Sequence, residues 1–210
     1  MKVTLYGATG MIGSRILREL SSRGHKVTAV ARETGKIPAL SGVTAKAGDI
    51  FDTEDVAANV KGSDAVICAY SPGYESVGDK LHNAFASIVQ ALDTSGVKRL
   101  IAVGGAGSLE VAPGLQLVDA PNFPAAWKEI ALAHRDALEV VKNSDLDWTS
   151  LSPSAMIEPG ERTGKFRLGK DGLLTDSKGE SRISAEDYAI ALVDELEHPQ
   201  HIRQRFTVGY

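Results

Sequence analysis

Short apolar runs alternate with stretches of helical periodicity along most of this chain. The apolar runs lie at residues 3–6, 27–31, 43–47, 65–70, 99–103, 147–151 and 205–208. Between several of them, apolar residues recur every three or four positions, as on one face of a helix, at 55–60, 79–95 and 127–143. Strands that alternate with helices predict a parallel sheet with right-handed crossovers. The pattern therefore favours an α/β fold with a doubly wound parallel sheet.

Residues 158–179 depart from this rhythm. They are rich in glycine and charge, with one candidate strand at 165–168, and we expect a small C-terminal excursion that covers the substrate side of the sheet. Ser184 and Asp187 then have the spacing of a capping box, which predicts the start of a further helix. No internal repeat or long linker divides the sequence, so a single domain over residues 1–210 is expected.

Three glycines connect the first expected strand to the first expected helix. Gly7 permits the tight turn, Gly10 leaves room for a pyrophosphate at the backbone, and Gly13 lets the helix pack against the sheet. The N–H groups and the positive dipole end of the helix would then bind phosphate oxygens. This turn predicts a dinucleotide site of the Rossmann type, with a turn that binds no ligand as the alternative. The expected contacts are Gly7, Thr9, Gly10, Met11, Ile12 and Gly13.

The end of the second strand distinguishes the two nicotinamide dinucleotides in Rossmann proteins. An acidic residue there accepts hydrogen bonds from the ribose hydroxyls, whereas an arginine pairs with the 2′-phosphate of NADPH. This chain has Ala31 at the strand end, followed by Arg32 and Glu33. Arg32 favours NADPH over NADH, although Glu33 keeps NADH open and a solvated loop charge is the alternative for Arg32.

Other turns at the carboxyl ends of strands are also expected to contact the cofactor. After the third strand, Asp49 is placed to accept a hydrogen bond from the adenine amino group while Ile50 packs on the ring. A plain strand-to-helix turn with Asp52 as N-cap is the alternative, and the two descriptions are compatible. The turns after the fourth and fifth strands add these expected contacts: Ala69, Tyr70, Ser71, Gly104 and Gly105.

Composition narrows the classes of function. The 210-residue chain carries a formal net charge of −4, which argues against a nucleic-acid surface. No apolar run is long enough for a membrane span, and Met1 leads directly into a strand without a signal peptide. The single cysteine, Cys68, has the context of a small buried hydrophobe. We therefore expect a cytoplasmic protein that acts on a small molecule and holds no metal.

Three motifs together resemble those of the atypical short-chain dehydrogenases/reductases with an NmrA-like NAD(P)H-binding fold. They are Gly7-x-x-Gly10-x-x-Gly13, Gly48-Asp49-Ile50-x-Asp52 and Ile183-Ser184-x-x-Asp187-Tyr188-Ala189. Segments 69–73, 104–109 and 144–149 make the chain most similar to the NADH-flavin reductases and the biliverdin-IXβ/flavin reductases. The resemblance covers essentially the whole chain and implies a Rossmann fold and a nicotinamide cofactor.

Classical short-chain dehydrogenases protonate their substrate through a Tyr-x-x-x-Lys pair. By the family's spacing these positions fall on Ile130 and His134, which argues against a conventional alcohol dehydrogenase or epimerase. In the biliverdin-IXβ/flavin reductases a histidine stands at the position of His134, so the resemblance makes His134 a candidate to orient the acceptor or donate a proton. A helix-surface histidine is the alternative. Ser108 is a second catalytic candidate, although strict register places Ala106 at that position.

The resemblance also covers the turn after the sixth strand, where Ser152 and Pro153 match the family's turn beside the nicotinamide ribose. His198 and His201 lie close to the C-terminus and are expected on the surface. Three aromatic residues are candidates for a lid over a flat acceptor, with a place in the core as the alternative: Phe123, Trp127 and Phe166.

These observations favour an NAD(P)H-dependent reductase that transfers a hydride to free FMN or FAD, or to a similar planar acceptor such as a quinone or an azo dye. The absence of a Tyr-Lys pair is consistent with this reaction, because hydride transfer to a flavin ring needs alignment more than a positioned proton donor. The alternative is a regulator of the NmrA-like type that binds NAD(P) without turnover. Reduction of a small carbonyl with water as the proton source is a weaker third possibility. A monomer or a homodimer is expected.

Overall fold

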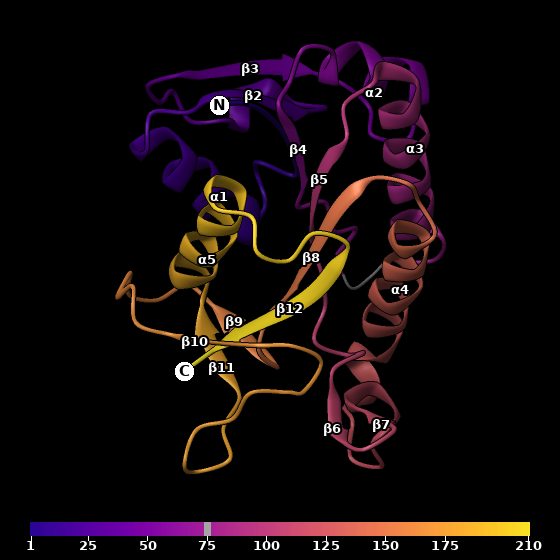
Figure 1. Ribbon diagram of the computed structural model, residues 1–210, viewed down its shortest axis with the longest axis vertical. Helices are drawn as coiled ribbons and strands as arrows, with labels where there is room; N and C mark the ends of the chain where they lie inside the picture. The colour runs from indigo at the N-terminus through magenta and orange to yellow at the C-terminus, as the bar shows by residue number, and fades with distance from the viewer. Residues whose placement is uncertain (74–76) are drawn as a thin grey trace.

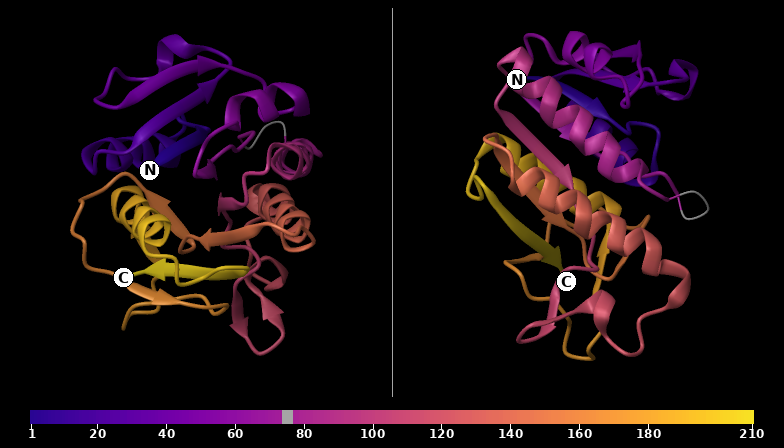
Figure 2. Two further views of the ribbon diagram at one scale, coloured as in Figure 1. Left: turned by 45° about the horizontal axis from the view of Figure 1, so that its top comes forward. Right: turned by 90° about the vertical axis from the view of Figure 1, so that its right-hand side faces the viewer.

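The computed structural model describes residues 1–73 and 77–210. Eight strands form one sheet in the order β10-β12-β8-β5-β4-β1-β2-β3, and every neighbouring pair is parallel except β10–β12 (Figures 1 and 2). The order changes direction beside β1, and in such sheets ligands bind at this switch point. The strands are β1 (Lys2–Tyr6), β2 (Lys26–Ala31), β3 (Val43–Ala47), β4 (Ala65–Cys68), β5 (Arg99–Val103), β8 (Asp147–Ser152), β10 (Arg167–Gly169) and β12 (Gln204–Gly209).

Helices cover both faces of the sheet, which confirms the doubly wound α/β fold. On one face α1 (Met11–Ser22) packs against α5 (Ala185–Glu197); on the other lie α2 (Thr53–Val60), α3 (Lys80–Ser95) and α4 (Ala125–Lys142), as Figure 1 shows. A separate cluster of buried apolar side chains fills the space between the sheet and each helical layer. The apolar run of β4 is buried at every position, as its sequence predicts.

Local capping chemistry explains where several helices begin and end. The Asp52 carboxylate accepts hydrogen bonds from the N–H groups of residues 54 and 55, at 3.0 and 3.2 Å, and α2 begins directly after it. Gly96 ends α3 with a φ of +76° in the left-handed region. The Ser184 hydroxyl accepts a hydrogen bond from the N–H of Asp187 at 3.0 Å, which confirms the predicted start of α5.

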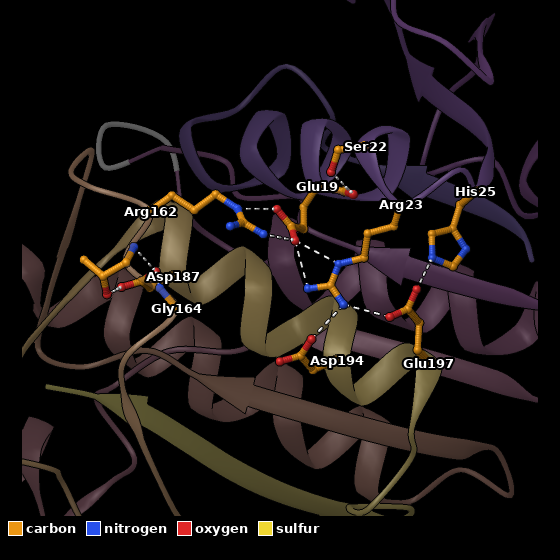
Figure 3. Close-up of polar contacts among 10 residues, drawn as sticks. Glu19, Ser22, Arg23, His25, Arg162, Gly164, Asp187, Asp194 and Glu197 are labelled. Atoms are coloured by element: carbon orange, nitrogen blue, oxygen red, sulfur yellow. Dashed lines mark hydrogen bonds and ion pairs between the residues drawn. The ribbon is translucent and has the colours of Figure 1, made fainter.

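The first half of the segment 158–179 lies on the face of α1 and α5, and residues 171–173 then pair with Glu110 in the region 104–124. Arg162 pairs with Glu19 of α1 at 2.8 Å, and the Asp187 carboxylate accepts hydrogen bonds from the backbone N–H groups of residues 163 and 164, both at 2.8 Å (Figure 3). The carboxylate expected to complete a capping box thus holds this loop at the N-terminus of α5. The segment continues into β10, which extends the edge of the sheet by pairing with β12.

A charged cluster fixes α1 against α5 (Figure 3). The Arg23 guanidinium lies 2.8 Å from the Glu19 carboxylate and 2.7 Å from the carboxylates of both Asp194 and Glu197. His25 contacts Glu197 at 2.9 Å. Because Arg162 also pairs with Glu19, this cluster connects the segment 158–179 to both helices of that face.

Residues 104–124 form an extension beyond the sheet, at the bottom of Figure 1. It contains a small hairpin, β6 (Glu110–Ala112) and β7 (Leu115–Gln116), and the 3₁₀ helix η2 (Leu117–Asp119). The remaining short elements are η1 (Thr34–Lys36) after β2, and the paired strands β9 (Met156–Glu158) and β11 (Arg182–Ser184). Within residues 1–73 and 77–210, no helix combines the length and the apolar composition needed to cross a lipid bilayer.

Candidate cofactor and acceptor cleft

A cleft of about 750 Å³ opens at the carboxyl ends of the central parallel strands. It extends from the turn between β1 and α1, past the ends of β2 and β4, to the ends of β5 and β8 and the N-terminal half of α4. All but two of the cofactor contacts expected from the sequence line it: Gly7, Thr9, Gly10, Met11, Ile12, Arg32, Asp49, Ile50, Ala69, Tyr70, Ser71, Gly104, Gly105 and Pro153.

Two of the three glycines in the first turn are required by packing within the protein. Gly7 has a φ of +81°, and a Cβ atom there would overlap the carbonyl oxygen of Ala69. A Cβ atom at Gly13 would overlap the carbonyl oxygen of Gly7, because α1 approaches the turn at backbone contact. Gly13 accordingly lies behind the lining of the cleft and supports its shape from there.

Gly10 differs from the other two glycines because the protein's own packing does not require it. A Cβ atom there would meet a single neighbour, the Gly7 carbonyl oxygen, at an ordinary 3.4 Å. Gly10 lines the cleft and is the N-cap of α1, where no side-chain hydrogen bond caps the helix. The first N–H groups of α1 and the open space at Gly10 fit a diphosphate, which satisfies those donors and the helix dipole together.

The end of the cleft beside β2 and β3 fits an adenosine group. Phe51 and Tyr70 stand edge to face with their ring centroids 5.6 Å apart, and Ile50 lies beside them in the lining. Burial raises the pKa of Tyr70, so its hydroxyl stays protonated. The Asp49 carboxylate accepts a hydrogen bond from the backbone N–H of Phe51 at 3.0 Å, which holds the turn that presents these side chains.

The two charged residues after β2 take different positions. Arg32 is exposed and lines the cleft. Glu33 instead pairs with Lys36 at 2.8 Å, and both of those side chains are exposed. The positive charge therefore faces the adenosine end, and the neighbouring negative charge is held by a lysine on η1.

The opposite end of the cleft is formed by apolar side chains of η2, α4 and the turn between them. On α4, Trp127, Ile130 and His134 follow one another at the spacing of a single helix face, and all three line the cleft. Ile130 and His134, where the sequence spacing predicts the positions of the Tyr-Lys pair, therefore both line the cleft. Leu117 and Phe123 line it from the extension of residues 104–124.

His134 is partly buried between α4 and the end of β5. A Cβ atom at Gly105 would lie 2.7 Å from the Cβ of His134, so the glycine allows the imidazole to pack directly on this turn. Burial lowers the pKa of His134 to about 4. At neutral pH the ring is therefore uncharged, and it presents one N–H donor and one acceptor nitrogen.

The structure does not bring every predicted site residue to the cleft. Ser108 is buried outside the lining, where its hydroxyl and carbonyl oxygens both accept hydrogen bonds from Arg205 at 2.9 Å. Ser152 is buried beneath Gly104, with its carbonyl oxygen bonded to the Thr207 hydroxyl at 2.9 Å. Phe166 packs against the core on the face of α1 and α5, whereas Phe123 and Trp127 do line the cleft.

Two other predictions concern residues away from the cleft. Cys68 is fully buried, and burial raises the pKa of its thiol to about 12, which confirms an unreactive core residue. His198 is exposed, which confirms its expected surface position, whereas His201 is only partly exposed. Its ring stacks on Phe206 with the centroids 4.1 Å apart, and Nδ1 lies 2.8 Å from the buried Glu195 carboxylate.

Sequence reasoning missed residues at both ends of the cleft. Phe51 could have been found, because it directly follows the Gly48-Asp49-Ile50 turn at the end of a strand. Leu117 and Ala120 gave no such signal, since they lie in a stretch whose periodicity predicts neither a strand nor a helix.

Together, the switch-point cleft, the glycine turn and the uncapped helix N-terminus define a dinucleotide-binding protein of the Rossmann class. The model of the NAD(P)H-binding family matches residues 7–199, and the chain therefore belongs to that family. This confirms the resemblance to the NmrA-like and short-chain dehydrogenase-like proteins.

Three solved structures are similar over the full length of the chain. A Burkholderia pseudomallei protein named as a candidate exported protein is 51% identical, covers 100% of both chains and has a TM-score of 0.92. A candidate epimerase from Bacteroides thetaiotaomicron is 41% identical, with 100% and 96% coverage and a TM-score of 0.92. A candidate NADH-flavin reductase from Streptococcus pneumoniae is 36% identical, with 100% and 99% coverage and a TM-score of 0.85. Because these three names differ, the reaction has to be inferred from the residues that line the cleft.

Proposed function

We propose that this protein is an NAD(P)H-dependent reductase that transfers a hydride to a planar acceptor, such as a free flavin, a quinone or an azo dye. The observation that carries the proposal is the continuity of the cleft, which joins a phosphate-binding turn to an apolar end with the exposed Trp127 and the partly buried Phe123. An apolar space beside a dinucleotide site favours a flat, poorly hydrated acceptor. The name of the Streptococcus pneumoniae relative supports the same reaction.

Each group of lining residues has a distinct task in this reaction. The turn at Gly10 binds the diphosphate, and the nicotinamide ring lies against Gly104 and Gly105 in the lining at the end of β5. When bound there, a reduced nicotinamide supplies the hydride. Trp127 and Ile130 pack on the acceptor and exclude water, and the neutral His134 donates a hydrogen bond that orients it.

The proposal includes a preference for NADPH over NADH. Arg32 lines the adenosine end while Glu33 is paired with Lys36, so a 2′-phosphate would meet the arginine and not the carboxylate. Arg32→Ala should weaken NADPH binding about tenfold and leave NADH binding within about twofold. Lys46→Ala is the matched control, because it removes an exposed cation from β3 outside the lining. Equal losses for both dinucleotides, measured by fluorescence titration, would contradict this role of Arg32.

Steady-state oxidation of NADPH and NADH, followed by nicotinamide absorbance with and without FMN, riboflavin or menadione, tests the reaction itself. Acceptor-dependent turnover is expected. Tight binding of NADPH without turnover on any planar acceptor would favour the NmrA-like regulator, which senses the dinucleotide without consuming it.

We also propose that the chain acts as a single-domain cytoplasmic monomer or homodimer, in the compartment where reduced dinucleotides are abundant. Light scattering on the purified protein measures its assembly state, and fractionation of expressing cells measures its location.

A further inference from the structure

The two ends of the cleft differ in charge. Among the described residues of the lining, the ionised side chains are Arg32 and Asp49, and both lie at the adenosine end. The acceptor end is formed by uncharged side chains, chiefly Leu117, Phe123, Trp127, Ile130, Ala131 and Ile157. Its polar side chains, His134, Asn122 and Ser154, are uncharged at neutral pH as well.

We propose that the acceptor end selects planar acceptors without an ionised group, such as a quinone or a flavin that lacks its phosphate. The inference rests on the proposed reductase function and narrows it to a substrate class. It would make FMN and FAD poorer acceptors than their uncharged counterparts, although their reacting rings are identical.

The physical reason is the cost of moving a phosphate against an apolar wall. A phosphate loses hydration there, and the described lining at this end offers no cationic side chain to replace it. Enzymes that use phosphorylated substrates gain affinity from arginine or lysine at the phosphate. In this cleft the cation of the lining, Arg32, lies at the opposite end, where the dinucleotide itself would occupy it.

The reaction balances with an uncharged acceptor. A quinone takes up two electrons and one proton as the hydride from C4 of NADPH, which leaves NADP⁺. One further proton from water completes the hydroquinone.

Riboflavin and FMN provide the test, since they share one ring system and differ by the phosphate. With the intact protein and saturating NADPH, we expect kcat/KM for riboflavin to exceed that for FMN, and menadione to be used as well. A kcat/KM for FMN equal to or higher than that for riboflavin would overturn the inference while leaving the reductase function intact. Turnover with none of the three would contradict the proposed function and the inference with it.

A charge introduced at the acceptor end sharpens the result. Asn122 is exposed and lines that end, so Asn122→Arg should raise the ratio of kcat/KM for FMN to that for riboflavin about fivefold. Gln90→Arg is the matched control, because Gln90 is an exposed amide on α3 outside the lining. The gain should fall at high salt. Equal ratios for the two variants would show that the phosphate does not pass Asn122, and would overturn the proposed position of the acceptor.

Discussion

The two ends of the cleft are built by different means. At the nucleotide end the shape comes from the backbone, where α1 meets the first turn so closely that Gly7 and Gly13 have no room for a side chain. At the acceptor end the shape comes from side chains on η2 and α4, and one of them, Trp127, is exposed to solvent. One end is therefore part of the packed fold, whereas the other is carried by a peripheral extension.

This difference has a consequence for how the two ends tolerate change. Backbone packing at the first turn couples cofactor binding to folding, so changes there affect both. Apolar side chains on a peripheral extension can be exchanged without disturbing the sheet, which allows relatives with one fold to use different acceptors. The differing names of the similar structures agree with such a division.

The strongest test of this comparison is a pair of substitutions in the first turn. Gly13→Ala should destabilise the protein by about 3 kcal/mol or more, because the new Cβ overlaps the Gly7 backbone. Gly10→Ala should change stability by at most about 1 kcal/mol, because its Cβ has an ordinary 3.4 Å neighbour, and it should weaken NADPH binding at least about tenfold by filling the diphosphate space. Urea unfolding and fluorescence titration measure the two effects.

The pair separates a packing role from a binding role. If Gly10→Ala lost as much stability as Gly13→Ala, the first turn would not contain a position reserved for the ligand. If it bound NADPH as well as the unmodified protein does, the diphosphate would have to lie elsewhere.

The acid stability of the protein tests the burial of His134 at the acceptor end. Its pKa is lowered to about 4, below the value of about 6.5 expected in the unfolded chain. The unfolded chain therefore binds a proton that the folded protein does not, and stability falls as the pH decreases from about 6.5 to about 4, by at most about 3 kcal/mol. In His134→Gln, the free energy of unfolding, measured in urea, should decrease less over this pH range than in the unmodified protein.

Buried carboxylates also affect acid stability, so the test compares the pH dependence of His134→Gln with that of a control variant. His82→Gln is the control, since His82 is exposed on α3. If the free energy of unfolding depended on pH identically in His134→Gln and His82→Gln, His134 would be as accessible to solvent as a surface histidine.

The sequence predicts the nucleotide end of the cleft better than the acceptor end, because the two ends are built by different means. The nucleotide end depends on short-range rules: a strand, a glycine spacing and a helix start fix its geometry, so Gly7, Gly10 and Gly13 could be assigned from the sequence. The capping roles of Asp52 and Ser184 are equally local and are confirmed. The parallel sheet and its two helical layers follow from the alternation of apolar runs and helical stretches.

The acceptor end depends on contacts between distant parts of the chain. The Asp187 carboxylate holds the loop at residues 163 and 164, more than 20 positions away in the sequence, and this fixes the first half of the segment 158–179 against α5. Ser108 faces Arg205, a contact across 97 positions. No local pattern reveals such pairs, which explains why the sequence placed Ser108 and Phe166 at the site.

Arg205 offers the last and smallest test, at the base of the acceptor wall. Its side chain is mostly buried and joins Ser108 to Asp171, with Nη2 at 2.6 Å from the Asp171 carboxylate. Arg205→Gln should cost about 1–2 kcal/mol in stability and raise KM for the acceptor about threefold, because the extension that carries Leu117 loses its anchor. The Kd for NADPH should stay within about twofold.

Arg203→Gln is the control for this substitution, since Arg203 lies two residues away and its side chain is 53% exposed. It should alter neither constant. Parallel losses of NADPH and acceptor binding in Arg205→Gln would mean that the two ends of the cleft form one rigid unit, and the division between a packed end and a peripheral end would then fail. A rise confined to KM for the acceptor would show that long-range contacts set the acceptor wall independently of the nucleotide site.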